Sequence, residues 1–143
     1  MAISQAVANS FKSEILQGIH DLESGGDSFK LALYTSVATL SSATTSYTTS
    51  SEVAASGEYV AGGGVLQTQQ VSLATGGVAI VDFADLSFTG VTLTARGALI
   101  YNSTEAKKAV CVLDFGSDKT ATSGTFTIQF PQFNSSSAIL RIA

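Results

Sequence analysis

Four aspartates at the ends of predicted strands are the side chains best placed for chemistry in this 143-residue chain: Asp82, Asp85, Asp114 and Asp118. If their strands are neighbours, the carboxylates could gather at one end of the fold and hold Ca²⁺ through oxygen ligands. Their spacing matches no known calcium loop, and aspartates at strand ends ordinarily accept hydrogen bonds from turn amides. We therefore predict no metal site, with calcium as the alternative. Arg96, an isolated cation in an apolar stretch, is expected to pair with one of the first three.

The other reactive side chains are too few for a catalytic centre. His20 is the single histidine and Cys111 the single cysteine, so a zinc site would need carboxylates as further ligands. We expect His20 to be solvated at the end of a helix and Cys111 to be a buried, inert thiol. The glycines at 62–64 lack the Gly-Lys-Ser/Thr continuation of a phosphate loop and indicate a flexible turn. We predict no enzymatic activity and no cofactor.

Charged residues make up only 13% of the chain, against roughly 25% in an ordinary soluble domain. Hydrophobic residues make up 45%, and the formal net charge is −4. The densest basic feature is the pair Lys107 and Lys108, so nucleic acid is not an expected partner. The chain shows no membrane-length apolar run and no secretory signal, so we expect no membrane partner and synthesis in the cytoplasm. Such a weakly charged, hydroxyl-rich surface favours contact with other protein.

The elements that must position these residues begin with a helix. Apolar residues recur every three or four positions over residues 1–24, which predicts one amphipathic helix ended by Gly25 and Gly26. The apolar stripe consists of Ile3, Val7, Phe11, Ile15, Ile19 and Leu22.

Beyond residue 28 the pattern becomes that of short strands separated by glycine-rich turns. Alternation over residues 29–34 predicts the first strand. The segment 35–57 is rich in Ser, Thr and Ala and is predicted to be a long surface excursion, either disordered or ordered by contact with a neighbour. Further strands are predicted at 65–73, 78–83, 92–101, 109–115, 125–130 and 138–142. The expected fold is mainly β: one domain over 1–143, with an antiparallel, jelly-roll-like β-sandwich over 28–143.

A series of short sequence landmarks, in order along nearly the whole chain, resembles virion structural proteins of tailed bacteriophages. The landmarks are residues 29–35, 47–52, Gly57, Tyr59, Gly62, Gly63, Leu66, 82–85, 94–102, 113–116, 126–130 and 139–143. Among these proteins the chain is most similar to head decoration, or cement, proteins. The resemblance implies a subunit that binds the lattice of the major capsid protein and stabilises the head, with no catalytic residues.

That expectation includes partners and contact residues. The partners would be the major capsid protein and further copies of the chain, as a homodimer or homotrimer on the capsid surface. Two alternatives stay open: a tail or baseplate component, and a carbohydrate-binding module for host attachment that would display aromatic side chains such as Tyr47, Tyr59 and Phe133. The residues predicted to contact partners are Val7, Phe11, Ile15, Ile19, Tyr47 and Tyr59.

Overall fold

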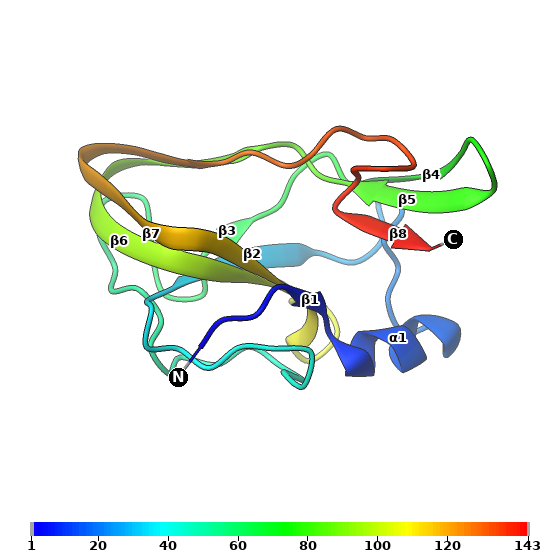
Figure 1. The fold of residues 1–143 in the computed structure, drawn as a ribbon, viewed down its shortest axis with the longest axis horizontal. Helices are drawn as coiled ribbons and strands as arrows, with labels where there is room; N and C mark the ends of the chain where they lie inside the picture. The colour runs from blue at the N-terminus through cyan, green and yellow to red at the C-terminus, as the bar shows by residue number, and fades with distance from the viewer. Residues whose placement is uncertain (1, 143) are drawn as a thin grey trace.

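The computed structural model of the chain describes residues 2–142 and confirms a mainly β fold with one short helix (Figure 1). All strand pairs are antiparallel, and they form two sheets, with strand orders β1-β7-β6-β2-β3 and β4-β5-β8. In chain order the elements are β1 (Ala6–Val7), α1 (Asn9–Leu16), β2 (Phe29–Tyr34), β3 (Gly64–Val65), β4 (Gln70–Ala74), β5 (Val78–Asp82), β6 (Leu86–Asn102), β7 (Lys108–Ile128) and β8 (Leu140–Ile142).

The long hairpin of β6 and β7 dominates the fold. Figure 1 shows the two strands crossing the top of the molecule together and turning back through its centre. The sequence predicted separate strands at 109–115 and 125–130, and this was wrong, because β7 runs without a break from the first range into the second and ends at Ile128. Gly116, with φ +82°, lies inside the strand at a β-bulge, where the register of the pairing between β6 and β7 shifts. Bulges use the same residue types as turns, so local sequence does not distinguish them.

The predicted strand 65–73 is two strands in different sheets. β3 pairs with β2 in the large sheet, whereas β4 pairs with β5 in the small one. Between them Thr68 adopts φ +55°, a conformation that ends an extended run. This break carries the chain from one sheet to the other.

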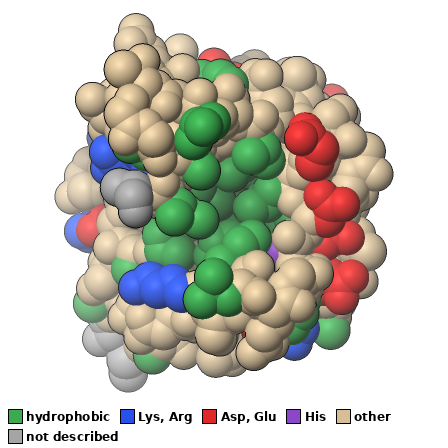
Figure 2. All heavy atoms as spheres, turned by 90° about the vertical axis from the view of Figure 1, so that its right-hand side faces the viewer, with side chains coloured by type: hydrophobic (Ala, Val, Ile, Leu, Met, Phe, Trp, Pro, Cys, Tyr) green, Lys and Arg blue, Asp and Glu red, His purple; other side chains and the backbone are tan. Residues whose placement is uncertain are grey.

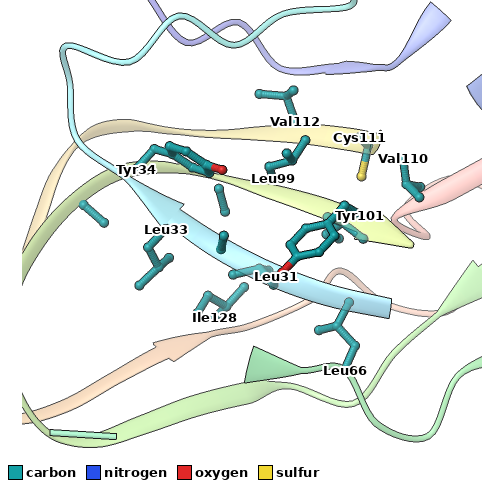
Figure 3. Packing of buried hydrophobic residues seen from close by; sticks show 14 of the residues in the cluster. Leu31, Leu33, Tyr34, Leu66, Leu99, Tyr101, Val110, Cys111, Val112 and Ile128 are labelled. Carbon is teal, nitrogen blue, oxygen red and sulfur yellow. The ribbon is translucent and has the colours of Figure 1, made fainter. Parts of the chain in front are cut away.

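The core is centred on β2, β6 and β7, whose side chains converge in Figure 3. Leu99 and Val112 are cross-strand partners, and both are fully buried. β2 is buried on both faces, since Ala32 and Tyr34 are as inaccessible as Leu33. Cys111 is buried in this core, as predicted, and burial raises the pKa of its thiol to about 12. A thiol in this state is unreactive near neutral pH.

The segment 35–57 packs against β2 and pairs with the end of this strand through a bridge between Tyr34 and Glu52. Ala38, Leu40 and Val53 are buried, and the Val53 amide donates to the Leu33 carbonyl at 2.9 Å. The prediction that this segment is too polar to enter the core was wrong. Three of its apolar residues reach the core, while most of the hydroxyl side chains between them stay near solvent.

The N-terminal helix is shorter than predicted. Instead of spanning 1–24, α1 covers Asn9–Leu16, and β1 before it pairs with β7. Gly18, at φ +74°, ends the helix, because its amide donates to Ile15 at 3.2 Å and the next amide, of Ile19, donates to Glu14 at 3.0 Å. This pattern is a Schellman cap, and it stands seven residues before the glycine pair that the sequence suggested.

All four tyrosines should ionise at a higher pH in the folded protein than in the unfolded chain. Burial raises the pKa of Tyr101 to about 12 and raises those of Tyr34, Tyr47 and Tyr59 further. Since an unfolded tyrosine ionises near pH 10, the tyrosine contribution to stability should be complete below about pH 10 and should be lost as the pH rises towards the folded-state values. A titration followed at 295 nm should show phenolate appearing only together with loss of near-ultraviolet circular dichroism. Two or more tyrosines titrating near pH 10 in folded protein would contradict this packing.

Candidate functional site: an apolar groove beside the helix

An open groove of about 670 Å³ lies between α1 and the three-stranded sheet. Figure 2 looks into it from the right-hand side of Figure 1 and shows hydrophobic side chains on its floor. The lining residues are Val7, Phe11, Lys12, Ile15, Leu16, His20, Asp21, Leu22, Glu23, Val71, Ala79, Val81, Leu140, Arg141 and Ile142. Three segments far apart in sequence therefore build it: 7–23, 71–81 and 140–142.

The helix wall is fixed to the large sheet. Val7 pairs with Cys111 in the β1–β7 ladder, and the Ala8 amide donates to the Val110 carbonyl at 2.9 Å. Phe11 is buried beneath the helix, whereas Leu16 at its end is 89% exposed. One side of the short helix thus anchors it, and its last turn leaves a large apolar side chain at the rim of the groove.

The sheet wall consists of two cross-strand rows of apolar side chains. Residues directly opposite each other in an antiparallel sheet share a face. The register therefore aligns Val71, Val81 and Leu140 in one row and Leu73, Ala79 and Ile142 in the next. The inner row is mostly buried, with Val81 and Leu140 nearly inaccessible, but in the outer row Leu73 is 74% and Ile142 58% exposed.

The segment 20–23, which follows the helix and lines the groove, is held by a buried hydrogen-bond cluster around His20. The side-chain oxygen of Asn102 accepts from the amides of Thr104 and Glu105, so its Nδ2 donates to His20 Nδ1 at 3.0 Å. The remaining proton of the ring is then on Nε2, which donates to Glu14 Oε1 at 2.9 Å. His20 is buried here and packs on Phe11, so the prediction of a solvated helix-end histidine was wrong. Its main partner lies 82 positions away and leaves no local signal in the sequence.

Charges of opposite sign flank the groove. In Figure 2 the acidic side chains stand in a column to the right of the hollow, and basic side chains lie below and to the left of it. Lys12 belongs to the helix side, while Asp21 and Glu23 belong to the segment that follows the helix. Within residues 2–142 none of these three charges forms an ion pair. The guanidinium of Arg141 is directed elsewhere, towards the Ser135 carbonyl at 3.4 Å.

The structure divides the predicted contact residues into two groups. Val7, Phe11 and Ile15 line the groove together, and Ile19 does not. The residues missed by sequence reasoning are those of the sheet wall, although the alternation of Val71 with Leu73 and of Leu140 with Ile142 could have indicated an apolar sheet face.

Tyr47 and Tyr59 point inward, to the carboxylate of Glu52. Tyr59 is fully buried and donates to Glu52 Oε2 at 2.7 Å, and Tyr47 donates to Oε1 at 2.5 Å while stacking on Tyr101. These two side chains therefore hold the segment 35–57 in place and are not displayed to a partner.

The four aspartates are not gathered together. No group of three or more His, Cys, Asp or Glu side chains suited to a metal is found within residues 2–142. Asp85, between β5 and β6, accepts the Phe130 amide at 2.8 Å. Asp114, which lies inside β7 and not at a strand end, accepts the Gly116 amide at 2.9 Å. Asp114 also pairs with Arg96 at 3.1 Å, which confirms the predicted ion pair. Burial raises the pKa of Asp82 above its usual value.

Comparison with known proteins adds no relative: no protein-family model, curated protein or solved structure matches the chain. In the part of the chain that the structure describes, no helix combines the length and hydrophobicity needed to cross a bilayer. The groove therefore has to be interpreted from its own chemistry. It offers apolar contact area flanked by charge, which suits the binding of another protein surface.

Proposed function

We propose that this protein is a non-enzymatic structural subunit of a tailed-bacteriophage particle, a decoration protein that binds the major capsid protein lattice and stabilises the head. The observation that carries the proposal is the groove, together with the exposed apolar row beside it. Apolar surface rimmed by polar and charged residues is typical of sites at which one protein binds another. The low charge of the chain and the resemblance of its ordered sequence landmarks to those of virion proteins support the same interpretation.

The proposed architecture is a jelly-roll-like sandwich opened at one end. The bent β6–β7 hairpin would supply strands to both layers, and the small sheet would extend one of them. A sandwich built on one long hairpin suits a decoration subunit, because many cross-strand bonds resist deformation while the sheet ends remain free for contact.

Of the three aromatic side chains named for the carbohydrate-binding alternative, only Phe133 is partly exposed without packing on the core, so they do not form a face of exposed rings. Sugar recognition of that kind needs exposed rings on one face, and Tyr59 is inaccessible while Tyr47 packs against Tyr101. A tail or baseplate component would bind its neighbours through the same kind of apolar surface. The number of copies per particle distinguishes it from a decoration protein.

Quantitative mass spectrometry of purified particles tests the proposal. We expect on the order of hundreds of copies per particle, as repeated modest contacts on a capsid lattice require. Particles produced without the protein should release their genome at lower temperature, and adding purified protein should restore the original value. A copy number of a few dozen would instead indicate the tail, and absence of the protein from finished particles would overturn the proposal.

A further inference from the structure

We propose that the free edge of β4 pairs with β4 of a second copy of this chain, in antiparallel fashion, about a two-fold axis that passes through Ser72. The two three-stranded sheets would then form one continuous sheet across the axis. This contact lies in the plane of the sheet and leaves the groove open. The inference therefore goes beyond the proposed function and does not rest on it.

The edge strands of the described chain differ in how they are protected against pairing. β1 and β3 have two residues each, and β8 has three, one of which is Arg141. The side of β7 that continues beyond β1 has a bulge at Gly116 and carries Lys119. Short length, charge and bulges are the usual means of preventing strand addition. β4 has none of them, since its five residues include no charge and no proline and pair with β5 in regular register.

The free edge of β4 is accessible to another strand. In the order β4-β5-β8 only β5 pairs with it, and four of its five residues are exposed. In Figure 1 the β4–β5 hairpin projects at the right-hand side of the molecule. The whole range 59–81, which includes this hairpin, contains no Asp, Glu, Lys or Arg. Alternate backbone N–H and C=O groups of such an edge point away from the sheet, and an extended strand is the partner that can pair with the whole row.

The side chains of β4 fit a copy of the same strand. When two identical antiparallel strands pair about a two-fold axis perpendicular to the sheet, residues opposite each other point to the same face. With Ser72 on the axis, Val71 of each copy lies opposite Leu73 of the other. These are the two exposed apolar side chains of β4, and the register places both on the groove face of the sheet. The pairing would therefore cover both twice and join the inner row of one copy to the outer row of its partner.

The pairing ends at two copies, because it uses the same edge in both. A ring of three would join β4 of each copy to a different edge of the next, and the other edge of this sheet is the three-residue strand β8 with its Arg141. Of the two oligomers that the sequence left open, the geometry thus favours the homodimer. A contact of five residues per copy is small, so we expect a dissociation constant in the micromolar range.

A cysteine on the axis tests the register. Ser72→Cys would place two thiols directly opposite each other, with the Cα separation of about 4.5–5.5 Å that a disulfide accepts. Mild oxidation should convert most of this variant to a covalent dimer, whereas the native Cys111 is buried and should not react. Gln70→Cys is the matched control: residue 70 is exposed in the same strand, but it would lie about 13 Å from its equivalent in the partner. Equal cross-linking of the two variants, or none for Ser72→Cys, would overturn the inference.

Charge at the same position provides a second measurement, by sedimentation equilibrium. The mass of wild-type protein should rise from the 14.7 kDa of one chain towards twice this value as the concentration passes through the micromolar range. Ser72→Lys and Ser72→Glu should each weaken dimerisation about fivefold, because like charges would face each other on the axis. An equimolar mixture of the two should pair more tightly than either alone. Urea midpoints close to the wild-type value would establish that all variants fold.

Three results would contradict the pairing of two copies. They are wild-type protein that stays monomeric at millimolar concentration, a mixture of the two charge variants that pairs no better than each alone, and a strand supplied by another protein. In the last case, amide hydrogen exchange over residues 70–74 would be slow in finished particles and fast in concentrated purified protein.

Discussion

Replacing Glu52 with alanine should lower the free energy of unfolding by about 3–4 kcal/mol, since hydrogen bonds to a charged group contribute about 1.5–3 kcal/mol each and are not additive. The carboxylate accepts three such bonds, from the hydroxyls of Tyr47 and Tyr59 and from the Gly62 amide at 2.8 Å. Its removal leaves the hydroxyl of a fully buried tyrosine without its best acceptor and removes the side-chain contacts that tie the segment 35–57 to Tyr59 and Gly62. Urea denaturation monitored by tyrosine fluorescence would measure the loss.

Two further variants separate charge from geometry. Glu52→Gln keeps the size of the side chain and one accepting oxygen, and a tyrosine hydroxyl can turn to accept from the new amide. Its free energy of unfolding should therefore fall by about half as much as that of Glu52→Ala. Glu58→Ala serves as the matched control, because Glu58 is exposed and accepts from the single backbone amide of Thr89 at 2.7 Å. Equal losses for Glu52→Ala and Glu58→Ala would mean that the tyrosine cluster does not hold the excursion.

The sequence predicted the elements that are defined by local pattern. The strand at 29–34 and the strand at 78–83 were predicted within a residue of their observed bounds, because their apolar residues and flanking turns lie within one short window. The burial of Cys111 and the pairing of Arg96 with an aspartate followed from the apolar context of each residue. In these cases local preference and the final fold agree.

What the sequence missed depends on residues distant along the chain. The stripe from Ile3 to Leu22 has helical spacing, yet Ile3 pairs with Leu40 and Val7 with Cys111, so tertiary pairing overrides the local pattern. The groove escaped prediction for the same reason, since its sheet wall becomes one surface only through the register of β4, β5 and β8. From its composition the segment 35–57 was expected to stay on the surface. Composition does not reveal that the carboxylate of Glu52 accepts hydrogen bonds from two tyrosines and so fixes the segment against the core.

Replacing Gly63 with alanine should have an effect as large as any single substitution in this chain. The sequence indicated a flexible turn at 62–64, but Gly63 is buried at φ +82°, and a Cβ there would collide with the Leu31 carbonyl and the Ala32 Cα of β2. These atoms are backbone of β2, which lies inside the large sheet between β6 and β3, so relief requires moving the sheet itself. We expect a loss of more than about 4 kcal/mol, seen as low soluble yield or a strongly reduced urea midpoint.

Gly76→Ala isolates the contribution of backbone conformation. Gly76 lies in the turn between β4 and β5 at φ +84°, with nothing near the position of the added Cβ. Its replacement should therefore cost only the left-handed strain of a non-glycine residue, about 1–2 kcal/mol. The difference between the two alanine variants then measures the close approach of Gly63 to β2. If both variants unfold at similar urea concentrations, the glycine run is a flexible turn after all, and the packing of β3 against β2 is looser than the structure has it.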